Sequence, residues 1–145
     1  NVALGKRAWQ SSTYVGEARW NDTNMFPYNA SLAVDGIVET NFRNNSCSST
    51  AAGQSSAYWE VDLANLYYIT TIEIYQRSDS LTDSNLGSVV LGKLQNGSYE
   101  YLTTLDRSGV FTVNTNSDHS FKGIQINHTG TRDILICLCE VQVFV

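Results

Sequence analysis

The chain has 145 residues and a formal net charge of −5, and 42% of its residues are hydrophobic but only 16% charged. This length predicts a single domain over residues 1–145, and the composition excludes a disordered chain. Because nucleic-acid binding depends on clustered Lys and Arg, the acidic balance argues against a nucleic-acid partner. No apolar run approaches the length of a membrane span. The start lacks the basic and apolar stretches of a signal peptide, so we expect a mature protein or an excised domain.

The first third of the chain has little regular pattern. Residues 11–29 read as a long loop and residues 30–34 as a short helical turn. In residues 58–63 apolar side chains alternate with Glu60 and Asp62, which predicts a half-buried strand. Residues 67–75 are rich in β-branched and aromatic side chains, which suit a pleated sheet.

The second half of the chain continues as a series of short strands. Asn96-Gly97 is a strong hairpin signal. Strands are predicted at residues 88–94, 98–105, 110–113, 122–127 and 133–145. In the last of these we expect six side chains on one face: Leu135, Cys137, Cys139, Val141, Val143 and Val145. Short strands at this spacing predict an all-β sandwich or barrel.

Glycosylation motifs and cysteines indicate the compartment. Five Asn residues begin Asn-x-Ser/Thr motifs: Asn21, Asn29, Asn44, Asn96 and Asn127. Cys137 and Cys139 are too close in sequence to pair in an extended strand, so a disulfide would join Cys47 to one of them. The third thiol is expected to be an inert buried side chain or to bridge to another chain or domain. We therefore expect an extracellular glycoprotein, either secreted or an ectodomain.

Four stretches, in order along the chain, together carry a family resemblance. They are Asn1-Val2-Ala3-Leu4-Gly5-Lys6-Arg7-Ala8, then Ala33-Val34-Asp35-Gly36 with Asn41-Phe42 and Cys47, then Tyr58-Trp59-Glu60-Val61-Asp62-Leu63, and finally Leu138-Cys139-Glu140-Val141-Gln142-Val143. This pattern resembles the F-type lectin (fucolectin) domain, a branch of the discoidin, or coagulation factor 5/8 C-type, superfamily. The resemblance implies a jelly-roll β-sandwich of two antiparallel sheets with ligand loops at one end. It also implies that Cys139 is the partner of Cys47.

The resemblance further implies one structural calcium ion between the Asp-Gly loop and the C-terminal Cys-Glu pair. The implied side-chain ligands are Asp35, Ser46 and Glu140, and the implied carbonyl ligands belong to Leu32, Ile37, Ser46 and Cys139. Calcium prefers six to eight such oxygens. The alternative is that Asp35 caps a turn and that Glu140 is a solvated strand residue. Since Ser46 also completes the Asn44 motif, a glycan on Asn44 would lie beside the cation loop.

The fucose motif of the family is only partly present. That motif has a His, then Arg-x-Asp, then a second basic residue, with adjacent cysteines to contact the sugar's methyl group. Arg77-Ser78-Asp79 matches its centre, and with Phe42 it forms the expected ligand site. The other positions hold Ser49, Ser84 and Ser80-Leu81. Each lost charge-assisted donor removes about 1.5–3 kcal/mol.

Three binding functions remain open at this stage. The first is an extracellular lectin domain with a divergent sugar site, in which Trp20, Phe26 and Tyr28 either stack on the ligand or anchor loops. The second is a protein-interaction or adhesion domain that has lost sugar binding, with Arg77 and Asp79 as a surface ion pair. The third is binding to membrane or matrix through Met25-Phe26, which the acidic charge disfavours.

An enzyme is not expected from this sequence. His119 and His128 lie in no catalytic motif, and the chain has neither a nucleophile elbow nor a zinc-protease helix motif.

Overall fold

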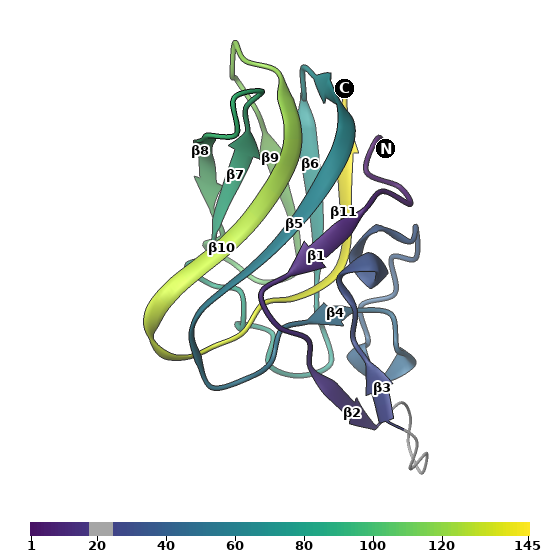
Figure 1. The fold of residues 1–145 in the computed structure, drawn as a ribbon. Coiled ribbons are helices and arrows are strands. Elements are labelled where there is room, and N and C mark those ends of the chain that lie inside the picture. The colour runs from purple at the N-terminus through teal and green to yellow at the C-terminus, as the bar shows by residue number, and fades with distance from the viewer. Residues whose placement is uncertain (18–24) are drawn as a thin grey trace.

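Two antiparallel sheets pack face to face and enclose the core (Figure 1). The computed structural model describes residues 1–17 and 25–145, without the side chains of residues 131–133. The five-stranded sheet has the order β1 (Ala8–Gln10), β5 (Gln54–Tyr67), β10 (Phe121–Ile134), β7 (Val89–Lys93) and β8 (Tyr99–Thr104). The four-stranded sheet has the order β4 (Ser48–Ser49), β11 (Cys137–Phe144), β6 (Thr71–Gln76) and β9 (Val110–Asn114). The all-β sandwich predicted from the sequence is confirmed.

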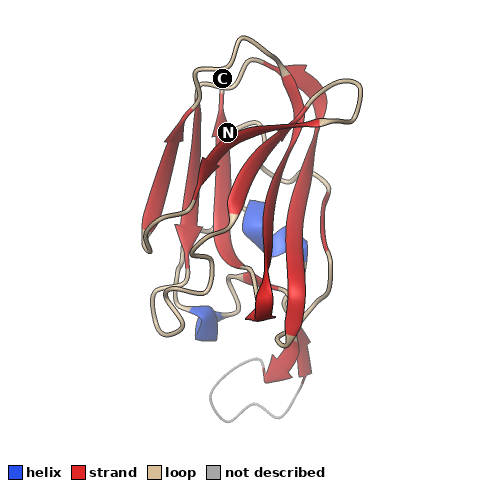
Figure 2. Cartoon of the chain, turned by 90° about the vertical axis from the view of Figure 1, so that its left-hand side faces the viewer, coloured by secondary structure: helices blue, strands red, loops and turns tan. Residues whose placement is uncertain are grey.

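A small hairpin and two short 3-10 helices lie outside these sheets (Figure 2). The hairpin pairs β2 (Val15–Glu17) with β3 (Met25–Pro27), so the prediction of one long loop over residues 11–29 is wrong. Its strands are too short to produce a periodic pattern. The helix η1 (Ala30–Val34) confirms the predicted helical turn, and η2 (Phe42–Asn44) follows it. Both chain ends lie at the end of the sandwich opposite the hairpin (Figure 1).

Alternating side chains of β5 build the centre of the core. Trp59, Val61 and Leu63 are completely buried, and the indole nitrogen of Trp59 donates to the carbonyl of Ala30 at 3.0 Å. This bond ties η1 to the sheet. The half-buried strand predicted for residues 58–63 is confirmed as the centre of a longer strand.

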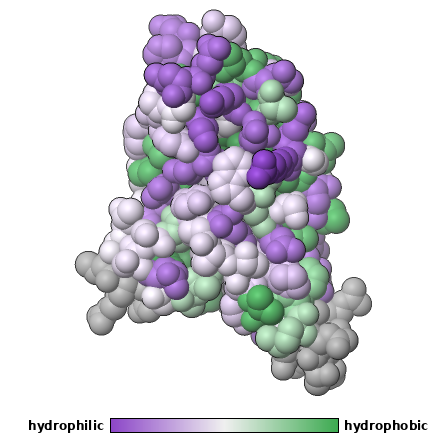
Figure 3. Space-filling model, viewed as in Figure 1, coloured by the Kyte–Doolittle hydropathy of each residue, from purple (hydrophilic) through white to green (hydrophobic). Residues whose placement is uncertain are grey.

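The outward side of β5 carries a buried carboxylate. Glu60 is only 3% exposed, and its carboxylate accepts hydrogen bonds from Lys93 at 2.8 Å, from the Tyr99 hydroxyl at 3.0 Å and from Gln125 at 3.1 Å, which compensate for the lost water. Lys93 also lies 5.8 Å from the ring centroid of Trp9. Figure 3 shows a mostly hydrophilic and neutral surface over this sheet.

Two predicted strand boundaries are wrong. The segment of residues 67–75 contains the end of β5, a turn and the start of β6. Ile69 is buried beneath this turn and Tyr68 is exposed. No Gly, Pro or Asn marks this turn, so composition could not reveal it. Strand β10 continues to Ile134, and β11 begins only at Cys137.

A bulge in β11 separates side chains that the sequence placed on one face. The register with β6 shifts between Leu138 and Glu140. Val141 and Val143 therefore join the main core, whereas Cys137 and Cys139 form a second cluster with Cys47; Leu135 packs on that cluster and Val145 is exposed. The predicted single face is wrong because one extra residue reverses the alternation.

Candidate functional site

An ion pair between Arg77 and Asp79 directly follows β6. Arg77 donates from Nε to Asp79 Oδ1 at 2.8 Å and from Nη2 to Asp79 Oδ2 at 2.9 Å. Nη2 also donates to Ser80 Oγ at 2.6 Å. The two charged side chains are only 13% and 15% exposed, so this bidentate pair is not an ordinary surface ion pair.

Phe42 supports this pair from η2. Its ring centroid lies 4.2 Å from the Arg77 guanidinium, and its backbone N–H donates to Asp79 Oδ1 at 3.1 Å. Burial opposes ionisation of Asp79, but the bonds from Arg77 and Phe42 outweigh it and hold the pKa of Asp79 below its ordinary value. The structure thus brings together Arg77, Asp79 and Phe42, the three residues predicted to form the ligand site.

The aromatic residues predicted as a stacking platform have different positions. Tyr28 is buried and stacks on Phe42 at 4.2 Å between ring centroids, which makes it an anchor for η2. Phe26 is half-buried and meets Tyr28 edge-on at 5.0 Å. Trp20 lies outside the described residues.

The positions of the missing sugar-binding residues do not supply equivalent donors. Ser49 is buried and donates its hydroxyl to the Thr50 carbonyl at 3.0 Å. Leu81 is 62% exposed and has a left-handed backbone with φ +49°, beside Ser80. Ser80 is a contact of Arg77 that the sequence did not reveal as a partner, although its position next to the Arg-x-Asp motif was a signal.

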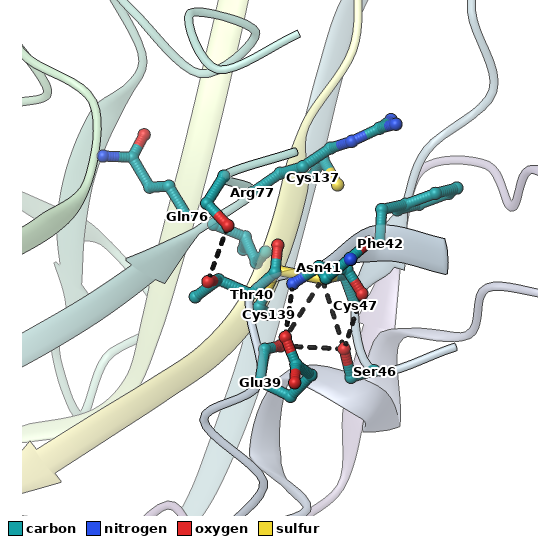
Figure 4. Close-up of a disulfide and its surroundings, with 12 residues drawn as sticks. Glu39, Thr40, Asn41, Phe42, Ser46, Cys47, Gln76, Arg77, Cys137 and Cys139 are labelled. Carbon is teal, nitrogen blue, oxygen red and sulfur yellow. Dashed lines mark hydrogen bonds between the residues drawn. A yellow bond between two sulfur atoms is a disulfide. The ribbon is translucent and has the colours of Figure 1, made fainter. Parts of the chain in front are cut away.

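A disulfide fastens the loop after η2 to β11. Cys47 and Cys139 are bonded, as the family resemblance implied, and they are 92 residues apart in sequence (Figure 4). Cys137 is a free, buried thiol, and burial raises its pKa to about 12. A thiol with this pKa is inert at neutral pH, which agrees with the expectation of a buried core cysteine.

Two carboxylates meet at the turn that follows η1. Both oxygens of Glu140 lie 3.2 Å from the Gly36 nitrogen, and Asp35 Oδ1 accepts from the Ile37 N–H at 2.8 Å. Glu140 is fully buried, and no Lys, Arg or His side chain of the described residues forms an ion pair with it. Burial first, and then the nearby Asp35, raise the pKa of Glu140 to about 7 despite the Gly36 N–H. The solvated position offered as the alternative for Glu140 is therefore wrong.

The remaining predicted cation ligands lie on η1, on the loop that follows it and on β11. Ser46 is buried and donates its hydroxyl to the Glu39 carbonyl at 2.8 Å (Figure 4). Leu32 belongs to η1, Ile37 follows the turn, and Cys139 precedes Glu140 in β11. The described residues contain no group of three or more His, Cys, Asp or Glu side chains suited to a metal. A cation here would need hydroxyl and carbonyl oxygens beside the two carboxylates, and a hard ion such as calcium accepts this donor set.

The glycosylation motifs lie at different exposures. Asn29, Asn44 and Asn96 are exposed, Asn127 is half-buried in β10, and Asn21 lies outside the described residues. Asn44 belongs to η2, the helix whose Phe42 contacts Arg77. Across residues 1–17 and 25–145, the structure has no helix long and apolar enough to cross a membrane.

A β-sandwich that carries an ion pair in its end loops, here Arg77 and Asp79, belongs to the class of small binding modules. No family model matches the sequence. Among curated proteins, the fucolectin of Anguilla anguilla is 38% identical over 79 residues, which cover 54% of this chain and 46% of the eel protein. Fucolectin-3 of Anguilla japonica is 37% identical over 94 residues, which cover 64% of this chain and 48% of that protein. The chain spans about half the length of the curated relatives it matches.

Solved structures match the fold of this chain over almost its whole length. A fucose-binding module of Streptococcus pneumoniae, SpX-3, matches with a TM-score of 0.79 and 25% identity, covering 100% of this chain and 97% of the module. The fucolectin from serum of striped bass, Morone saxatilis, matches with a TM-score of 0.79 and 25% identity, covering 99% of this chain and 47% of that chain. The chain described here therefore has the fold of the F-type lectin domain, and 54% to 64% of its length is similar in sequence to fucolectins.

Proposed function

We propose that this domain binds carbohydrate outside the cell, through the loops around Arg77, Asp79 and Phe42. The observation that carries the proposal is the way in which the guanidinium of Arg77 is held. Its Nε and Nη2 donate to Asp79 and Ser80, and the described part of the chain shows no hydrogen bond from Nη1. A fixed guanidinium with free N–H groups is a ready donor for sugar hydroxyls and ring oxygens.

The ligand class is a fucose-type or related terminal sugar of a glycan or glycoprotein. The fucolectins and the fucose-binding module among the relatives support this class. Two charge-assisted donors of the family motif are absent, and each would contribute about 1.5–3 kcal/mol. We therefore expect weaker binding of the free monosaccharide than of a larger glycan, which contacts more of the surrounding loops.

A structural calcium ion completes the proposal. Asp35, Glu140 and Ser46 would bind it by their side chains, and Leu32, Ile37, Ser46 and Cys139 by their carbonyls. The buried, uncompensated carboxylate of Glu140 supports a cation here. The ion would neutralise two adjacent carboxylates and stiffen the loop that leads to Phe42.

An extracellular location follows from the same chemistry. Disulfides persist in oxidising compartments, and the buried Cys47–Cys139 bond fits that setting. In a secretory pathway the exposed Asn29, Asn44 and Asn96 would be open to glycosylation, and the half-buried Asn127 less so.

A glycan array at millimolar calcium tests the function. The expected result is binding to a subset of fucose-bearing glycans, lost in Arg77→Ala and kept in Arg7→Ala, which removes an exposed guanidinium from the other sheet. Failure of the folded wild type to bind any glycan would refute the lectin function and favour a protein-interaction role. Binding that survives Arg77→Ala would instead refute the assignment of the site.

A further inference from the structure

The loop that carries the proposed sugar-binding residues is held by a buried amide. This loop joins β6 to β7, and Asn85 near its end is only 1% exposed. Asn85 Oδ1 accepts from the Cys137 N–H at 2.9 Å, and Asn85 Nδ2 donates to the Cys137 carbonyl at 2.7 Å. One side-chain amide thus bonds to both backbone groups of a β11 residue, as a residue of a neighbouring antiparallel strand would.

Gln76 extends this attachment to a second loop. Its Oε1 accepts from Asn85 Nδ2 at 3.3 Å. Its Nε2 donates to the carbonyls of Arg107 and Gly109 at 2.9 and 3.0 Å. Gln76 is also buried, and it directly precedes Arg77 (Figure 4). Two buried amides therefore join the end of β6, the sugar-site loop, the start of β11 and the loop before β9.

The conformation of the sugar-site loop needs such support. Leu81 is exposed, yet its φ of +49° is a backbone conformation that side-chain-bearing residues rarely adopt. Ser78 and Asp79, at the start of the loop, bond to Thr40 and Phe42. The turn that follows is closed by local bonds, such as Ser84 N–H to the Leu81 carbonyl at 3.0 Å. The attachment at Asn85 connects these turns to the core, since Cys137 belongs to a central strand of its sheet.

We propose that Asn85 is a positioning residue for carbohydrate binding: it holds the loop of residues 77–86 against β11 and so keeps Arg77 and Asp79 aligned with Phe42. This inference rests on the proposed function. A loop already fixed in its binding conformation loses less entropy when the ligand binds, so the attachment increases affinity without touching the sugar.

The chemistry of the site requires an amide at this position. An Asp carboxylate would still accept from the Cys137 N–H but could donate to neither the Cys137 carbonyl nor Gln76. An apolar side chain would leave both backbone groups of Cys137 buried without partners. A short side chain that has both a donor and an acceptor, as an amide does, satisfies the N–H and the carbonyl of Cys137 together.

Asn85→Ala tests the proposal, with Val143→Ala as the matched control. Val143 is buried at the far end of β11, so its truncation lowers stability without touching the loop. Affinity for a glycan selected on the array, melting temperature and the NMR signal of the Arg77 Nε–H would be measured for each. Loss of the fixed loop should weaken binding about tenfold or more in Asn85→Ala and speed solvent exchange of the Arg77 Nε–H. Val143→Ala should lower the melting temperature alone.

Binding within about twofold of wild type in Asn85→Ala, with an unchanged Arg77 Nε–H signal, would overturn the proposal. If the wild type binds no glycan, the proposed function fails, and the Arg77 signal alone decides whether Asn85 positions the loop. If Asn85→Ala does not fold, hydrogen exchange of the wild type decides. An amide of Cys137 that exchanges as fast as an exposed loop amide would refute the attachment, and slow exchange would support it.

Discussion

Replacing Glu140 by Gln should have opposite effects with and without calcium. In the wild type, a fully buried carboxylate accepts a bond from Gly36 and lies near Asp35, with no basic side chain of the described residues paired to it. Without a cation, ionisation of this group opposes folding. Glu140→Gln removes the charge, retains the shape, and keeps an oxygen that can accept from the Gly36 N–H.

The magnitude follows from the pKa of Glu140, which burial raises from its ordinary 4.5 to about 7. Because the folded-state pKa lies above that of the unfolded chain, the contribution of Glu140 to the stability of the calcium-free protein is greatest below pH 4.5 and is lost as the pH rises to about 7. By pH 8 this loss amounts to about 3 kcal/mol. An unpaired amide N–H offsets part of it, so we expect Glu140→Gln to gain about 2 kcal/mol, or about 6 °C in melting temperature, in chelator at pH 8.

Thermal unfolding followed by circular dichroism, in EDTA and in calcium at pH 5 and pH 8, measures these effects. Saturating calcium should stabilise the wild type by about 2–3 kcal/mol when present at about a hundred times its Kd, and should leave Glu140→Gln unchanged. At pH 5 in EDTA the variant should lose its advantage. Glu39→Gln, which neutralises an exposed carboxylate of the following loop, is the control and should respond to calcium like the wild type. A wild-type melting temperature indifferent to both calcium and pH would refute the reasoning.

Three further stability changes follow from the packing, each measured by urea unfolding. Replacing Cys47 and Cys139 by Ser opens a crosslink between residues 92 apart, and chain entropy predicts a loss of about 4 kcal/mol; no loss would contradict the bond. Lys93→Met leaves Glu60 buried without its cation and should cost about 3 kcal/mol, and the double variant with Glu60→Gln should recover most of it. Gly92→Ala places a Cβ 2.5 Å from a buried aromatic ring and should cost about 1–3 kcal/mol, so a neutral effect would show that the ring can move.

Alternation along the strands made much of the fold predictable. Trp59, Val61 and Leu63 are buried as their spacing indicated, and the Asn96-Gly97 turn forms the predicted hairpin, with Gly97 at φ +90°. These features depend on neighbours in sequence. The bulge in β11 and the β2–β3 hairpin escaped prediction because register shifts and very short strands leave no periodic signal.

The candidate site was only partly predictable. The Arg-x-Asp motif located Arg77 and Asp79, and the resemblance placed Phe42 with them and paired Cys47 with Cys139. Nothing in the sequence indicated Asn85, because its partner on β11 lies 52 residues away. A buried amide that bonds a distant backbone carries no local pattern.

The sequence by itself determined which residue types face the core and which chemical groups are available, because side-chain periodicity and donor chemistry are local properties. The tertiary structure alone decided which of these groups meet. It stacked the Arg77 guanidinium on Phe42, buried the Glu140 carboxylate beside Asp35 and enclosed Glu60 on the outer sheet face. Burial and distance set the energy of a charge, and both exist only once segments far apart in the chain pack together.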